Sequence, residues 1–167
     1  MKKLLKIILL FCIPLSLFAD VVWPALYLET RMFSWWAITF GMIIEIIFIK
    51  YIFDFDFKKI IKIVFIANIL SALIGIVAIP LSGILIELIP GGILYYTLNL
   101  GTFNPITWGI TFIVASFVTT YIEYIIYKKL FLIEIQIKDT KFFKLFLVNI
   151  LSVGIAFISL WIYPVHL

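Results

Sequence analysis

Four long apolar stretches limit the folds that this sequence can adopt: residues 33–53, 60–79, 105–127 and 142–162. Each is close to the length of about 20 residues that a helix needs to span the hydrocarbon core of a bilayer. The composition agrees, because 65% of the residues are hydrophobic and 13% are charged, whereas soluble domains have about 45–50% and about 25%. The sequence therefore predicts an all-α polytopic membrane protein with four mature transmembrane helices.

The N-terminal residues 1–19 have the features of a secretory signal peptide. Three lysines surround the start of an apolar run, and Ala19 provides a small residue at a cleavage point. Leu17, three residues before the cut, suits cleavage less well. Retention of this segment as a first transmembrane helix therefore stays open. In both cases residues 20–167 form the predicted integral membrane domain.

The positions of the lysines predict an orientation. If the N-terminus is inside, all lysines fall on the cytoplasmic side and Arg31 falls on the other, as the positive-inside rule requires. The tryptophans map to the extracytoplasmic boundary, where Trp35, Trp36, Trp108 and Trp161 are expected to anchor the helices. We therefore expect a multi-pass protein of the bacterial inner (plasma) membrane with an extracytoplasmic C-terminus.

Residues 81–100 form an additional apolar segment, and hydrophobicity alone would allow another span here. A fifth span here would move five downstream lysines to the outside, against the positive-inside rule. Pro80, Gly83 and the sequence Pro90-Gly91-Gly92 favour a broken helix over a straight one. The segment is therefore predicted to be re-entrant or interfacial.

One polar pattern occurs twice within the apolar sequence. Glu45 is followed by Asn-Ile-Leu-Ser at 68–71, and Glu123 is followed by the same four residues at 149–152. The asparagines make this informative, because the chain contains few of them. We interpret the pattern as an internal duplication. It predicts two helical hairpins inserted in the same direction, that is, a parallel repeat.

Counting along the helices from the flanking lysines places the repeated polar residues at one depth in the membrane. The predicted intramembrane polar cluster consists of Glu45, Asn68, Ser71, Glu123, Asn149 and Ser152. Ser116 and Thr119 extend the second copy along one helix face and should face protein, and Gly75 and Ala156 should let helices approach closely. Two interpretations remain open. The carboxyls and amides hold the hairpins together by hydrogen bonds, or they form a proton or cation site.

Both connections inside the predicted hairpins alternate apolar and polar residues. The alternation covers 54–57 in the first and 133–138 in the second. A period of two indicates a strand or an extended chain. These segments are predicted to form a small collar or to lie on lipid headgroups.

Catalysis has little support in the sequence. His166 is the single histidine of the chain and Cys12 the single cysteine. This excludes a histidine-based triad, an intramolecular disulfide and a thiolate metal cluster within one chain. We predict no catalytic residue, no metal site and no cofactor.

The lysines lie in short clusters beside apolar stretches, which is typical of topology determinants and not of nucleic-acid binding. The predicted partners are the lipid bilayer and either further copies of the chain or other membrane proteins. The sequence thus favours a structural or accessory component of a membrane complex. The alternative is a small proton- or cation-coupled transporter or channel that uses the paired Glu and Asn residues, and an intramembrane enzyme is a third hypothesis.

Overall fold

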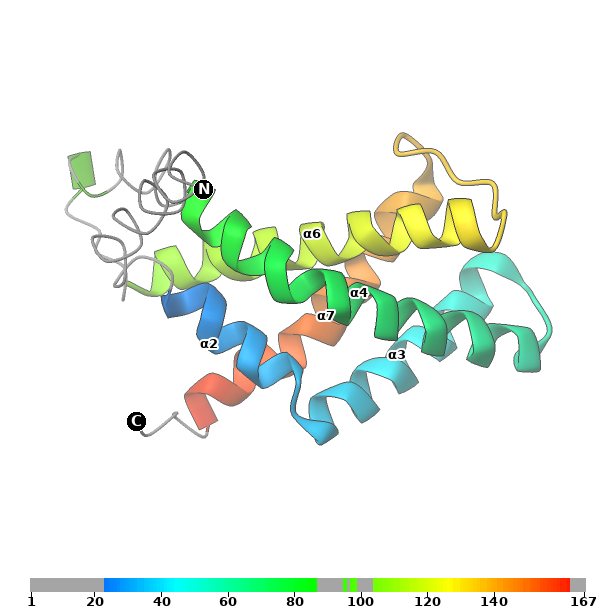
Figure 1. Ribbon diagram of the computed structural model, residues 1–167, viewed down its shortest axis with the longest axis horizontal. Helices are drawn as coiled ribbons and strands as arrows, with labels where there is room; N and C mark the ends of the chain where they lie inside the picture. Colours follow the sequence, from blue (N-terminus) through cyan, green and yellow to red (C-terminus); the bar gives the residue numbers. More distant parts are fainter. Residues whose placement is uncertain (1–22, 87–94, 96, 99–103, 163–167) are drawn as a thin grey trace, which may run out of the picture.

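The computed structural model describes residues 23–86, 95, 97–98 and 104–162 (Figure 1). These residues form five helices: α2 (Trp23–Met32), α3 (Trp35–Phe53), α4 (Phe57–Ile86), α6 (Pro105–Leu130) and α7 (Thr140–Ile162). Four of these, α3, α4, α6 and α7, are long and apolar enough to cross a membrane. The all-α class and the four membrane-length helices predicted from the sequence are therefore confirmed. The predicted signal segment, Cys12 and His166 lie outside the described residues.

The four long helices pack in a ring. α3 contacts α4 and α7, and α6 contacts the same two helices. The outside of this ring carries large apolar side chains that are more than half exposed, such as Ile47, Leu73, Val77 and Ile158. Exposed apolar surface of this extent is unfavourable in water but not in lipid. The surface thus fits a multi-pass membrane protein.

The short helix α2 was not predicted from the sequence. It contacts all four long helices, and it lies at the end of the bundle where α7 finishes and α6 begins (Figure 1). Ala25 and Leu28 are 2% and 1% exposed and pack in one cluster with Ile79, Val153 and Ala156. α2 therefore closes this end of the apolar core.

Helix α4 is longer than predicted at both ends and continues through Pro80 to Ile86. Pro80 lacks the amide that would bond to the carbonyl one turn earlier. Close packing supports the helix beyond this point, because a Cβ atom on Gly83 would lie 2.7 Å from the Cβ atom of Ala25. Residues 81–86 thus continue α4. The rest of 81–100 is described only at residues 95, 97 and 98.

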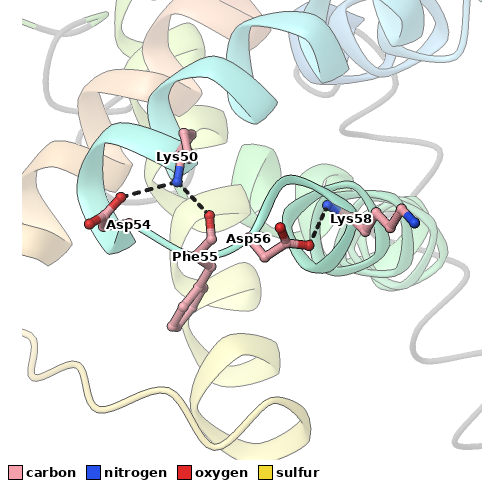
Figure 2. Close-up of polar contacts among 5 residues, drawn as sticks. All are labelled: Lys50, Asp54, Phe55, Asp56 and Lys58. Carbon is pink, nitrogen blue, oxygen red and sulfur yellow. Dashed lines mark hydrogen bonds and ion pairs between the residues drawn. The ribbon is translucent and has the colours of Figure 1, made fainter.

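A three-residue turn connects α3 to α4, and Figure 2 shows its polar contacts. Asp54 has a left-handed backbone with φ of 48° and ends α3. The ammonium group of Lys50 donates to Oδ1 of Asp54 at 3.0 Å and to the carbonyl oxygen of Phe55 at 2.7 Å. Asp56 Oδ2 then accepts the backbone N–H of Lys58 at 3.1 Å, which caps the start of α4.

The connection from α6 to α7 has no regular secondary structure, and the described residues contain no strand. Leu132, near its start, has a left-handed backbone with φ of 53°. Ile133 and Ile135 are 7% and 2% exposed and pack into the core, whereas Glu134 and Gln136 are exposed. The alternation in the sequence therefore corresponds to a segment that buries its apolar side chains and exposes its polar ones. This connection and the α3–α4 turn lie at the same end of the bundle (Figure 1).

The predicted start of α6 is confirmed. Asn104 Oδ1 accepts the backbone N–H of Ile106 at 2.9 Å, and Pro105 occupies the first helical position. The asparagine satisfies one of the free amides of the first turn, and proline has no amide to satisfy. This local chemistry fixes where the helix begins.

Candidate functional site

Two carboxyl–amide pairs lie inside the bundle. Asn68 Nδ2 on α4 donates to Glu45 Oε2 on α3, and Asn149 Nδ2 on α7 donates to Glu123 Oε2 on α6 at 2.9 Å. In each case the same amide nitrogen also donates to the backbone oxygen four residues earlier in its own helix, at 2.9 Å and 3.3 Å. Each asparagine therefore joins its own helix to the preceding long helix in the same manner.

Ser152 connects the two pairs. Its hydroxyl donates to Glu45 Oε1 at 3.0 Å, so α7 is bonded to α3 as well as to α6. Gly41 makes this approach possible, because a Cβ atom at that position would lie 2.6 Å from Ser152 Oγ. Sequence reasoning missed Gly41. Its position one helical turn before Glu45 places it on the same helix face and could have identified it.

Ser71, which matches Ser152 in the sequence pattern, makes a different contact. Its hydroxyl donates to the backbone oxygen of Asn68 at 3.2 Å, within its own helix. Glu123 consequently has one oxygen, Oε1, without a hydrogen-bond partner in the described part of the chain, whereas both oxygens of Glu45 accept hydrogen bonds. The Glu–Asn hydrogen bond is therefore common to both halves of the cluster, whereas the bond made by the serine differs between them.

Tyr127 is a further member of the site that the sequence reasoning missed. It is fully buried and lies one turn after Glu123 on the same helix. Its hydroxyl has no hydrogen-bond partner among the described residues, and neither has Asn149 Oδ1. Buried polar atoms are rarely left unpaired. The site therefore contains buried polar atoms that have no partner among the described residues. The signal for Tyr127 was its four-residue spacing from Glu123.

Most of the small and hydroxyl-bearing residues that were expected to face protein are buried, but one of them does not mediate a helix contact. Ser116 and Thr119 are 0% and 9% exposed, so the prediction that they face protein is confirmed. Ala156 is also buried in the core. Gly75 does not mediate a helix contact, because a Cβ atom there would approach only Ile79 of the same helix, at 3.5 Å. The expectation that Gly75 brings helices together is therefore wrong, and it borders a cavity instead.

That cavity has a volume of about 200 Å³ and lies between α3, α4 and α7, with α2 at one end. Glu45, Asn68 and Asn149 line it at one end and Glu29 lines it near α2. Apolar side chains form most of the wall between them. The polar cluster is thus in contact with an internal space. In the described part of the chain, no group of three His, Cys, Asp or Glu side chains could hold a metal ion.

Two of the four predicted anchor residues lie beside one another, and the other two differ in burial. Trp108 has its ring centroid 6.3 Å from that of Trp161 and 6.2 Å from that of Tyr27. Trp35 is 77% exposed, whereas Trp36 packs against the buried cluster beneath α2. Their role at a membrane boundary stays a prediction.

Comparisons with family models, with curated proteins and with solved structures found no match to this chain. The function must therefore be argued from the site itself.

Proposed function

We propose that this chain is a structural or accessory membrane protein in which two carboxyl–amide pairs hold four transmembrane helices together. One observation carries the proposal: each of the four membrane-length helices supplies one member of the two pairs. Hydrogen bonds between helices in a membrane contribute about 0.6–2 kcal/mol each. The further bond from Ser152 to Glu45 joins the pairs into one network.

In this proposal the helix pairs α3–α4 and α6–α7 are two copies of a duplicated hairpin, inserted in the same direction. The same Glu–Asn bond in both pairs supports the duplication. The lysine-rich turns would lie in the cytoplasm and the anchor tryptophans at the outer face of a bacterial inner membrane. Residues 1–19 would be a signal peptide or an extra span, and 20–167 the membrane domain.

Alanine substitution of the carboxyls tests the structural role. Glu45→Ala and Glu123→Ala each remove the carboxyl acceptor that joins an asparagine to the neighbouring helix and leave its amide only the backbone oxygen of its own helix. We therefore expect both to lower the thermal unfolding temperature in mild detergent. Glu→Gln at the same positions keeps an acceptor and should cost less. Glu134→Ala, in the exposed connection before α7, is the matched control and should have no effect. Full stability of the double alanine variant would refute the proposal.

The unpartnered Glu123 Oε1 and Tyr127 hydroxyl favour one alternative, a proton or cation site in a small transporter or channel. Four spans per chain would require an oligomer to enclose a path. The alternative predicts flux of protons, Na⁺ or K⁺ into liposomes that is lost in Glu45→Gln and Glu123→Gln. Flux that survives both substitutions, or no flux above protein-free liposomes, would eliminate it.

A further inference from the structure

The cavity between α3, α4 and α7 is large enough for a ligand. Its volume of about 200 Å³ exceeds the roughly 150 Å³ of an engineered apolar cavity that binds benzene. One turn of a helix, about 10 Å wide and about 5.4 Å long, occupies roughly 400 Å³. The cavity can therefore accept a narrow hydrocarbon chain, but it is too small for a helix from a partner protein or from a second copy of this chain.

Small residues on α3 and α4 create this space. Ala37 and Gly41 on α3 and Ala72 and Gly75 on α4 all line the cavity. A Cβ atom on Gly75 would meet only Ile79 of its own helix, so no neighbouring helix fills the space at that point. The two helices also lie apart at the end of the bundle that is far from their turn (Figure 1).

The polar residues of the cavity wall are largely bonded within the protein. Both oxygens of Glu45 accept hydrogen bonds, from Asn68 and from Ser152. The hydroxyl of Ser71 donates to a backbone oxygen of α4. Glu29 adds a carboxyl at the α2 end, and apolar side chains form most of the wall. Because a buried water needs roughly two to four polar partners, the cavity favours an apolar occupant over a row of waters.

The cavity wall is one side chain thick on the outer side of α3 and α4. Ile38 on α3 and Phe65 and Ile69 on α4 line the cavity and are also 43%, 50% and 46% exposed. A side chain that contributes to both surfaces separates them by a single layer. Because both helices are long enough to cross a membrane, the medium beyond this layer is the hydrocarbon of the bilayer.

We propose that this cavity holds one acyl chain of a membrane lipid, which enters between α3 and α4 past Ile38 and Ile69. An empty cavity leaves the atoms of its wall without van der Waals contacts on one side, and a hydrocarbon chain restores these contacts. Lipid tails are as apolar as the side chains of the wall, so entry has no desolvation cost. This inference goes beyond the structural role, because it concerns the space between the helices and not the bonds that join them.

Photolabelling of the full chain in phosphatidylcholine nanodiscs tests the site. The probe is a phosphatidylcholine with a diazirine near the middle of one acyl chain, and mass spectrometry maps the labelled residues. Val153 and Val148 form a matched pair, since both lie on α7 and are 2% exposed but only Val153 lines the cavity. We expect label on Val153 and none on Val148, with Val77, which is 68% exposed, as the positive control. Label on neither valine, or on both equally, would overturn the proposal.

Two glycine variants test the location. Gly75→Leu places a side chain in the cavity, so labelling of Val153 should be lost while that of Val77 persists. Gly109→Leu on α6, where nothing lies within 4 Å of an added Cβ atom, should label like the wild type. If Gly75→Leu does not fold, Ala72→Leu blocks the same space. Unchanged labelling of Val153 in a folded blocking variant would refute the proposal.

Discussion

Ser71 and Ser152 have the same place in the repeated pattern but different partners. Ser152 donates to a carboxyl of another helix, and Ser71 donates to the backbone of its own. A hydroxyl that bonds to its own helix adds little to stability. One that joins two helices within a membrane adds more. The contribution of each of these two serines to stability therefore depends on the group to which its hydroxyl donates.

We accordingly predict that Ser152→Ala lowers stability by about 1 kcal/mol, whereas Ser71→Ala changes it little. Thermal unfolding of both variants in the same detergent measures the difference. Each substitution removes one hydroxyl from a small side chain, so each is the control for the other. Equal losses in the two variants would contradict the importance of the bond between α7 and α3.

Glu29 gives a prediction about pH. It is 7% exposed, and burial raises the pKa of its carboxyl above the ordinary value of 4.5. The folded state then keeps a proton that the unfolded state has released. The free energy of unfolding therefore falls as the pH rises from 4.5 to the raised pKa, and the loss persists at higher pH.

Glu29→Gln is neutral at every pH, so this loss should disappear. We expect its unfolding temperature to equal that of the wild type below pH 4.5 and to exceed it increasingly as the pH rises through the window. Comparing the two proteins at each pH cancels the contributions of all other groups. A difference that does not change with pH would show that burial of the Glu29 carboxyl is not responsible.

At the residue scale, the sequence predicted that the glutamates bond to the asparagines, because an acid and an amide repeated within apolar sequence need partners there. It did not assign which asparagine each glutamate meets. It could not predict the contact of Ser152 with Glu45. That bond depends on how closely α7 approaches α3, which Gly41 permits. Helical periodicity reports which residues share a face, but not which helix that face meets.

At the scale of helices, hydrophobicity predicts the long helices, whereas tertiary contacts determine the position of α2 and the end of α4. The long helices follow from hydrophobicity alone. The ten residues of α2 are too few to span a membrane and include Glu29, Thr30 and Arg31, so no membrane pattern marks them. Ala25 and Gly83 bring α2 close to the part of α4 that follows Pro80, and α2 also contacts the other three long helices. Neither partner can be identified from its own segment.

Gly83→Leu should separate α2 from α4, because the added side chain collides with Ala25. We expect faster amide hydrogen exchange throughout α2 and in the last turn of α4, with α6 unchanged. Gly109→Leu provides the control, since it adds the same side chain where there is open space. Exchange in α2 that is the same in both variants would contradict the proposed dependence.

At the scale of the whole molecule, the ring of helices has two different ends. The α3–α4 turn and the α6–α7 connection lie at one end, and α2 lies at the other (Figure 1). Lys141 and Lys144 at the first end lie 5.6 Å and 5.3 Å from the ring centroids of Phe53 and Tyr51. Basic residues therefore gather at the end with the turns, as the predicted cytoplasmic side requires.

Alkaline phosphatase fusions test this orientation, because the enzyme is active only outside the cytoplasm. A fusion after Leu167 should be active, and a fusion inserted at Lys138, in the α6–α7 connection, should be inactive. Both fusions contain the three long helices α3, α4 and α6, so each controls for expression of the other. The reverse result would mean that the chain is inverted, and activity of both would contradict a membrane span at α7.

The bond from Ser152 to Glu45 has a consequence for biosynthesis. Helix α3 leaves the ribosome before α4, α6 and α7, so Glu45 can meet Asn68 early but must wait for α7 to fill its second oxygen. Until α7 has been made, only one of the two carboxyl oxygens of Glu45 has a hydrogen-bond donor from the chain. A polypeptide truncated before α7 would retain this defect permanently, and membrane quality-control proteases could recognise it.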